Sequence, residues 1–302
     1  MKEILYEALA GAGHSLDFAG VERWGNRLGS LLWTALRERR SMAEENMVYH
    51  LGVTSEQART MTRNNFRNTG RSFLELFLSK NVDKRFVKDR LTISDPESFQ
   101  ALVETDRPFV GTSAHLGAWE LMIGLYHVLI PERKKQVVVR RPKDEALHKL
   151  MTRMRTNPTV EVVEHRQAVL KVLRCLKKGG ATGFMVDHNC STTEAVYLPF
   201  LKKIAAVNMG PALLAIRSEA LIQPLYLLRD EENGFILHTE HALDTRVLTG
   251  SREEKIQKAA LFYTQSVERA VHRWPEQWYW LHRRWKTQPP PEWNYIPPEN
   301  MK

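Results

Sequence analysis

The 302-residue sequence is 43% hydrophobic and 26% charged, which is ordinary globular usage and excludes a wholly disordered chain. The 44 lysines and arginines outnumber the 35 aspartates and glutamates, and the net charge of +9 favours anionic partners. No RRM, KH, zinc-finger or helix-turn-helix pattern accompanies this charge, so a nucleic-acid partner is not expected. The two cysteines form no C-x-x-C pair, which predicts a reducing compartment without disulfides or structural zinc.

The sequence also bears on membrane attachment. No segment carries the roughly 20 consecutive apolar residues that a transmembrane helix needs. The first residues include Glu3 and lack the basic and apolar regions of a secretory signal. We therefore expect a cytosolic protein, or one bound peripherally to a membrane from the cytosolic side.

Three regions follow one another along the chain. Residues 1–106 are predicted to be almost wholly helical, residues 107–288 to form an α/β core continuous with these helices, and residues 289–302 to form a proline-rich tail. In the first region, the helix from Val21 to Arg37 gathers leucines and Trp33 near one face, with arginines around it. Such a helix suits the head-group region of a bilayer or the protein core, and the second is slightly favoured. A longer amphipathic helix is predicted over residues 55–78.

From Pro108 onward, strands and helices alternate. Predicted strands cover residues 108–114, 136–140, 160–163, 181–186, 221–228 and 235–240. Predicted helices cover residues 117–129, 142–155, 166–178, 208–218 and 252–274. Pro142 is expected in the first turn of its helix, and Asn208 is expected to cap another. This alternation predicts the α/β class, with a mostly parallel or mixed central sheet flanked by helices and chemistry at the carboxyl ends of its strands.

The segment from Thr112 to Glu120 is the strongest candidate for chemistry. His115 falls where a strand ends and a helix begins, and Gly117 permits a tight turn there. On a continuous helix, residues five apart point about 140° away from each other, so contact with Glu120 requires His115 to lie in the turn. We expect Glu120 to accept a proton from one imidazole nitrogen, which would make the other a general base. A structural histidine at a helix start fits the spacing equally well.

This pattern resembles the H-x-x-x-x-(D/E) motif of glycerolipid-type acyltransferases. Residues 20–288 resemble the lipid A late acyltransferases (the lauroyl/myristoyl family) in that superfamily. Five further segments agree in order: Val139-Arg-Arg-Pro142, Arg153-Met-Arg-Thr-Asn157, Val186-Asp-His-Asn189, Gly210-Pro-Ala-Leu-Leu-Ala215 and the stretch from Pro275 to Lys286. The sequence departs from the family at Leu201, after Phe200, where a glycine is common, at Asn189, where aspartate is common, and in lacking the transmembrane helix of many members.

The resemblance implies transfer of a fatty acyl chain from acyl carrier protein, or from coenzyme A, to a hydroxyl of a lipid A precursor or related anionic glycolipid. His115 would deprotonate that hydroxyl for attack on the thioester. Backbone N–H groups at the helix start, or an arginine, would stabilise the oxyanion. No metal or other cofactor is expected. The implied location is the cytoplasmic face of the inner membrane, as a peripheral protein without a transmembrane helix.

Four more residues are candidates for substrate binding. Arg141, Arg153 and Arg155 would hold phosphates of the acceptor or the phosphopantetheine arm of the donor, although helix-end arginines can also simply face solvent. Asp187 ends a buried strand, where an unpaired charge is costly. We expect it to pair with an arginine such as Arg153 or to anchor the active-site loop, and a purely structural ion pair is equally compatible with its position.

Lipid contact is expected from two parts of the chain. The aromatic and basic residues from Trp278 to Trp285 would face the membrane or, slightly favoured, lock the C-terminus onto the sheet as a strand. Helices over residues 121–130 and 209–216 would line the acyl slot.

Two rival functions remain compatible with the sequence. One is acylation of a lysophospholipid or another lipid, and the other is peripheral lipid binding without catalysis. A metal hydrolase is disfavoured, because the histidines show no H-x-x-x-H or H-E-x-x-H spacing.

Overall fold

The computed structural model describes residues 11, 16–155, 157–165, 168–230, 232 and 234–293. Within these residues, the centre is an eight-stranded sheet in the order β1-β9-β8-β2-β5-β3-β4, with β10 paired to β8. Its strands are β1 (Leu91–Ile93), β2 (Phe109–Ser113), β3 (Lys135–Val139), β4 (Val160–Glu164), β5 (Ala181–Met185), β8 (Leu221–Arg229), β9 (Phe235–Thr239) and β10 (Leu243–Asp244). From β8 to β4 every neighbouring pair is parallel, whereas β9 and β10 are antiparallel to β8.

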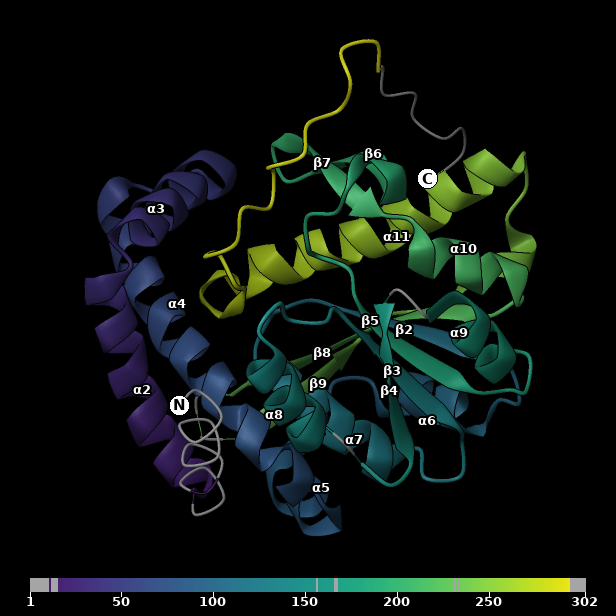
Figure 1. Ribbon diagram of the computed structural model, residues 1–302, viewed down its shortest axis with the longest axis horizontal. Coiled ribbons are helices and arrows are strands. Elements are labelled where there is room, and N and C mark those ends of the chain that lie inside the picture. Colours follow the sequence, from purple (N-terminus) through teal and green to yellow (C-terminus); the bar gives the residue numbers. More distant parts are fainter. Residues whose placement is uncertain are drawn as a thin grey trace.

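Helices cover both faces of this sheet (Figure 1). One face carries α5 (Lys84–Arg90), α6 (Pro96–Glu104) and α7 (Met122–Leu129), and the other carries α9 (Ala168–Leu176), α10 (Gly210–Arg217) and α11 (Arg252–Arg273). A column of three helices, α2 (Phe18–Ala35), α3 (Arg37–Leu51) and α4 (Ser55–Glu75), stands at one side. The helix α8 (Glu145–Arg155) packs on a 3-10 segment, Leu76–Asn81, and a separate hairpin pairs β6 (Ala195–Phe200) with β7 (Lys203–Asn208).

Alternation along the central strands produces the two layers of the core. In β2, Phe109 packs with the α5–α7 layer and Val110 with the α9–α11 layer. In β8, Leu225 and Tyr226 divide in the same way. Successive side chains of a strand point to opposite faces, so a strand buried on both sides becomes a nearly continuous apolar run. The predicted α/β class, with a mostly parallel sheet flanked by helices and a helical N-terminal region, is confirmed.

Several local predictions were wrong. The strand β1 lies inside the region predicted to be almost wholly helical. The helix expected to begin at Pro142 begins at Glu145, because the Asp144 carboxylate accepts the Leu147 N–H (3.0 Å) and so satisfies a first-turn donor. Likewise α10 begins at Gly210, whose N–H donates to the Asn208 side chain (2.7 Å).

The β6–β7 hairpin was not predicted. Its turn places Leu201 at a φ of 53°, a left-handed conformation that glycine adopts most easily. At this position the family resemblance of the sequence leads one to expect a glycine. Because the usual glycine signal of a tight hairpin is missing, the sequence pattern gave no indication of the turn.

The N-terminal helix α2 has two unlike sides. Gly25 and Gly29 let it approach α4 so closely that a Cβ on Gly29 would lie 2.3 Å from the carbonyl oxygen of Phe66. On the other side, Trp24 and Leu31 are 51% and 64% exposed. The glycine side of α2 therefore packs against α4, as predicted for a core-facing helix, while the opposite side exposes apolar residues to solvent. Among the described residues, none forms a helix that is both long and apolar enough to cross a membrane.

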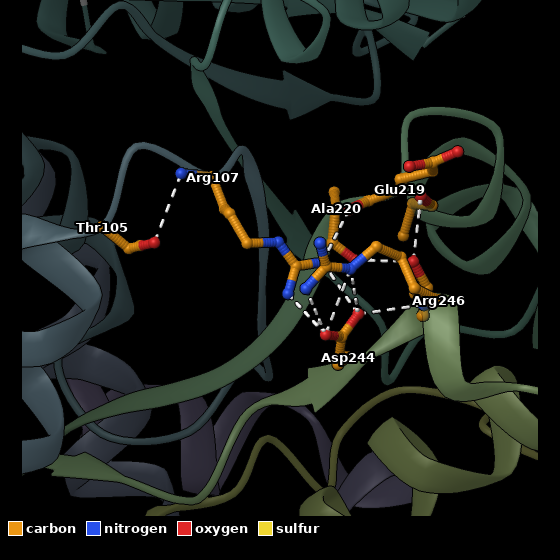
Figure 2. Close-up of polar contacts among 8 residues, drawn as sticks. Thr105, Arg107, Glu219, Ala220, Asp244 and Arg246 are labelled. Atoms are coloured by element: carbon orange, nitrogen blue, oxygen red, sulfur yellow. Dashed lines mark hydrogen bonds and ion pairs between the residues drawn. The ribbon is translucent and has the colours of Figure 1, made fainter.

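Arg107, Asp244 and Arg246 form a cluster of ion pairs, the arginine clasp, at the amino end of β2 (Figure 2). The turn that carries His115 follows the other end of this strand. Two guanidinium nitrogens of Arg107 donate to the Asp244 carboxylate at 2.6 and 2.8 Å, and one also donates to the carbonyl oxygen of Glu219 (2.8 Å). Arg246 donates to the same carboxylate (2.9 Å). The hydrogen bonds from Arg107 and then Arg246 lower the pKa of Asp244. The clasp connects β2 to β10.

A buried histidine predicts how stability depends on pH. His50 is 1% exposed and stacks on Trp285, with ring centroids 4.0 Å apart. Burial, followed by the charges of Lys203 and Lys202, lowers the pKa of His50 from 6.5 to about 4. Because the folded pKa is depressed, the neutral ring's stabilising contribution is complete above pH 6.5 and is lost as the pH falls toward 4. Between pH 7.5 and 5, this contribution should fall by about 2 kcal/mol.

Urea unfolding of the wild type and of His50→Phe at both pH values measures this loss. The phenyl ring keeps the stacking but does not titrate, so the wild type should lose about 2 kcal/mol more stability than the variant on acidification. Equal losses in the two proteins would show that His50 is not the responsible group.

Candidate active site

The site forms where two central strands end side by side. The strands β2 and β5 are parallel neighbours, and Ser113 pairs with Met185 at their carboxyl ends. His115 and Asp187 each lie two residues beyond that pair. The matching register brings Nδ1 of His115 to 2.9 Å from Oδ1 of Asp187. Both the predicted place, at the carboxyl edge of the sheet, and the predicted position of His115 in a turn are observed.

The carboxylate fixes the tautomer of the imidazole. The side chain of Asp187 is fully buried, and burial opposes its ionisation. The charge of His115 and the hydrogen bond from it outweigh burial, and with help from His188 and His282 they lower the pKa of Asp187. An ionised carboxylate only accepts hydrogen bonds, so Nδ1 of His115 carries a proton, and in the neutral ring Nε2 is the nitrogen with the lone pair. The His115 side chain is 19% exposed and can meet a substrate.

The second oxygen of Asp187 holds the backbone and the C-terminal segment. It accepts the backbone N–H of His115 (2.9 Å) and the indole N–H of Trp278 (2.9 Å). The N–H of Tyr279 in turn donates to the carbonyl oxygen of His115 (2.8 Å). Asp187 therefore anchors the active-site loop, which was one of its three predicted roles. The alternative pairing with an arginine such as Arg153 is not observed, because His115 and Trp278 take its buried oxygens.

Much of the segment from Trp278 to Trp285 packs inside the protein. Trp278, Trp280 and Arg284 are each no more than 2% exposed, so the less favoured alternative, a membrane-facing edge, does not hold for these residues. The expected strand reduces to a single bridge between Trp278 and Leu116. The segment therefore fastens the C-terminal part of the chain to the turn that carries His115.

A tight turn at Gly117 sets the direction of the chain after His115. Gly117 has a φ of 66°, and a Cβ there would lie 2.1 Å from the carbonyl oxygen of Leu227. Its carbonyl oxygen accepts from Ser72 (2.9 Å), which also accepts from Arg229 (2.7 Å). Arg229 is in turn paired with the buried carboxylate of Glu75 at 2.6 and 3.0 Å. This network between α4 and β8 holds the turn in place.

The predicted hydrogen bond between Glu120 and His115 is not observed. It lies in a short 3-10 segment, Trp119–Leu121, and its two oxygens accept from Arg155 at 2.6 and 3.0 Å. Among the described residues, no hydrogen bond joins Glu120 to His115, because Asp187 already occupies Nδ1 and the turn directs Glu120 toward α8. Burial disfavours the charge on Arg155, but Glu120 outweighs burial and raises the pKa of Arg155.

The three candidate arginines have different surroundings. Arg155 lies against the site, and its side chain is 15% exposed. Arg153 lies on the exposed side of α8. Arg141 pairs with Glu145 (2.5 Å) and Glu164 (3.5 Å) on the surface. The structure therefore joins Arg155 to the predicted site through Glu120 and leaves Arg141 in an ion-pair network of its own.

Two histidines near the His115–Asp187 pair, the catalytic dyad of this candidate site, were not predicted as site residues from the sequence. The ring of His188 lies 4.0 Å from that of His115, and part of the residue is exposed. Desolvation by the neighbouring protein, followed by the charge of His115, lowers the pKa of His188 to about 3. His282 is more enclosed, and its two nitrogens face the carbonyl oxygens of Tyr279 and Asp187. Two features of the sequence could have identified them. His188 directly follows Asp187, and His282 lies within the segment from Trp278 to Trp285.

This arrangement is typical of general-base enzymes. A histidine oriented by a buried carboxylate, at the carboxyl edge of a mostly parallel sheet, can take the proton of a hydroxyl without a nucleophilic serine or cysteine.

The comparisons with known proteins identify the class of reaction. The family model described as bacterial lipid A biosynthesis acyltransferase matches residues 14–287. The chain belongs to this family of acyltransferases. It is 25% identical over 285 residues to a lipid A biosynthesis lauroyltransferase of Escherichia coli (strain K12), covering 91% of this chain and 88% of the relative. It is 23% identical over 274 residues to a lipid A biosynthesis palmitoleoyltransferase of the same strain, covering 88% of this chain and 84% of the relative.

Proposed function

We propose that this protein transfers a fatty acyl chain from an acyl carrier protein or coenzyme A thioester to a hydroxyl of a lipid A precursor or related anionic glycolipid. The observation that carries the proposal is the contact between His115 and the buried Asp187 in a chain of the lipid A acyltransferase family. Nε2 of His115 removes the proton of the acceptor hydroxyl as its oxygen attacks the thioester carbon. The thiol leaves, and His115 returns the proton to it.

The developing oxyanion needs a donor, and the backbone of the turn supplies few. The N–H groups of Leu116, Gly117 and Ala118 already donate to carbonyl oxygens of Ala114, Gln277 and Leu227. Arg155 is better suited, because Glu120 holds its Nε and Nη2 while its Nη1 makes no hydrogen bond within the described residues. We assign Arg155 to the oxyanion or to a substrate phosphate, and Glu120 to orienting that guanidinium.

The acyl chain needs an apolar place near the dyad. The helix α7 begins directly after the 3-10 segment that carries Glu120. Farther along it, toward the amino end of β2, Leu125 and Tyr126 line a small apolar cavity with Phe109 and Leu225. We place the acyl chain along α7, where apolar side chains from the helix and the sheet would cover it.

The acceptor is a lipid, so the enzyme must work at a membrane surface. We assign membrane contact, at the inner membrane, to the exposed side of α2. Trp24 and Leu31 project from this side, and the guanidinium of Arg27 lies 4.5 Å from the centre of the Trp24 ring. An apolar stripe beside arginines matches the apolar and anionic layers of a lipid head-group region.

The variant carrying Trp24→Gln and Leu31→Gln should bind anionic phospholipid vesicles at least about tenfold more weakly, since burying each side chain contributes about 1–2 kcal/mol. Vesicle co-sedimentation measures the loss. A control variant carrying Leu170→Gln and Val247→Gln removes two other exposed apolar side chains and should bind like the wild type. Equal binding by all three proteins would exclude α2 as the contact.

The activity is tested with the purified protein and a defined thioester. Acyl carrier protein or coenzyme A thioester is supplied with either a phosphorylated disaccharide lipid or a lysophospholipid, and mass spectrometry detects the gain of one acyl group. Acylation of the disaccharide lipid is the expected result. Acylation of the lysophospholipid alone would replace the proposed acceptor. Vesicle binding with no acylation of either lipid would indicate a lipid-binding protein without catalysis.

A further inference from the structure

We propose that His115, Asp187 and His188 form a binding site for a zinc ion, and that the bound ion inhibits acyl transfer. Two imidazoles and one carboxylate are ligands that zinc prefers, and three protein ligands with one open position are common in zinc proteins. The inhibition rests on the proposed function, whereas the binding of the ion does not.

The distances suit a single ion. One candidate ligand atom from each of the three residues lies within 4.8 Å of the other two. Nδ1 of His115 and Oδ1 of Asp187 are already 2.9 Å apart, and the rings of His115 and His188 are 4.0 Å apart. Zinc lies about 2.0–2.2 Å from nitrogen and oxygen ligands, so two ligands of one tetrahedral ion are roughly 3.3–3.6 Å apart. Small rotations of His115 and His188 would therefore complete the site.

The neighbouring residues orient the carboxylate of Asp187 and leave the site accessible to an ion from solvent. Oδ2 of Asp187 is held by the N–H groups of His115 and Trp278, which fixes the direction of Oδ1. His188 is exposed, so an ion can reach the site from solvent and keep a water molecule as its fourth ligand. His282 is excluded as a ligand, because both its nitrogens face backbone carbonyl oxygens.

Binding replaces a proton with the ion. The N–H bond at Nδ1 of His115 breaks, Nε2 takes up a proton from solvent in its place, and Nδ1 coordinates zinc with Oδ1 of Asp187 and one nitrogen of His188. A divalent cation on the imidazole withdraws electron density from Nε2 and ends the hydrogen bond that orients the ring. His115 then can no longer act as the base, and acyl transfer stops until the ion is removed.

The experiment uses the full-length protein after dialysis against a chelator. Calorimetric titration with zinc measures binding, and titration with cobalt(II) gives a visible absorption spectrum that reports four-coordinate nitrogen and oxygen ligation. His188→Ala and His188→Gln should each weaken zinc binding by at least about tenfold, since each removes one of three ligands. The control His241→Ala removes another exposed histidine and should bind like the wild type.

Activity provides the second readout. Zinc should inhibit the wild type reversibly, with recovery after addition of a chelator. The rate of each protein with zinc is compared with its own zinc-free rate, and the His188 variants should resist inhibition. Unchanged zinc affinity in both His188 variants would overturn the site. Zinc binding that depends on His188, in a protein that acylates no lipid, would uphold the site and reject the proposed function instead.

Discussion

His115→Gln is expected to lower the rate of acyl transfer by about 10²–10⁴-fold, the usual contribution of a general base. The glutamine amide can still donate to Asp187, but it has no basic nitrogen to take the hydroxyl proton. The measurement is the initial rate of acylation under saturating thioester, compared with the wild type. Because the acceptor and donor bind elsewhere in the site, the loss should fall on kcat more than on KM.

Two controls separate a missing base from a damaged site. The variant should match the stability of the wild type within about 1 kcal/mol in denaturant unfolding, since the His115 side chain is only partly enclosed. It should also bind lipid vesicles normally, because α2 is unchanged. A His115→Gln protein that keeps more than a tenth of the wild-type rate would remove His115 from the mechanism.

Asp187→Asn is expected to have an effect of similar size, about 10²–10⁴-fold, through the tautomer of His115. The amide presents an N–H group to Nδ1, so Nδ1 becomes the acceptor and the proton moves to Nε2, where the base is needed. The substitution is also expected to lower the stability of the protein more than one on the surface would. The remaining amide oxygen must still accept the N–H groups of His115 and Trp278 in a buried position.

The matched control is Glu194→Gln, which removes a carboxylate that also pairs with a histidine, His165, but at an exposed place. It should leave the rate within about twofold, as surface substitutions generally do. Circular dichroism and denaturant unfolding of Asp187→Asn show whether the sheet is retained. A folded Asp187→Asn protein with the wild-type rate would mean that Asp187 is structural and that another group sets the tautomer of His115.

The features that follow from local sequence were predictable. The apolar runs, the glycine at the turn and the place of His115 at a strand end all depend on residues close together in the chain. Glu120 was assigned to His115 for the same reason, since it is the nearest carboxylate downstream. The true partner, Asp187, is 72 residues away. Its position depends on β5 lying next to β2, and the sequence pattern of strands does not determine the order in which they pair.

Non-local packing explains the other differences. The indole of Trp278 is part of the site because the C-terminal segment folds back to the His115 turn, whereas its aromatic and basic composition suited a membrane edge equally well. The arginine facing Glu120 was among three candidates, and only the orientation of α8 distinguishes Arg155 from Arg153. Helix periodicity locates such residues on a face, but it does not determine what that face contacts.

The shared register of β2 and β5 has a consequence for the synthesis of the enzyme. On the ribosome, His115 is made long before its carboxylate partner, and the indole that steadies the carboxylate comes later still, near the end of the chain. In the proposed mechanism, a nascent or half-folded polypeptide therefore contains an ordinary histidine and no catalyst. If His115 is the base, reactivity toward thioesters arises only when these distant segments have folded together, and an unfinished molecule would not consume them.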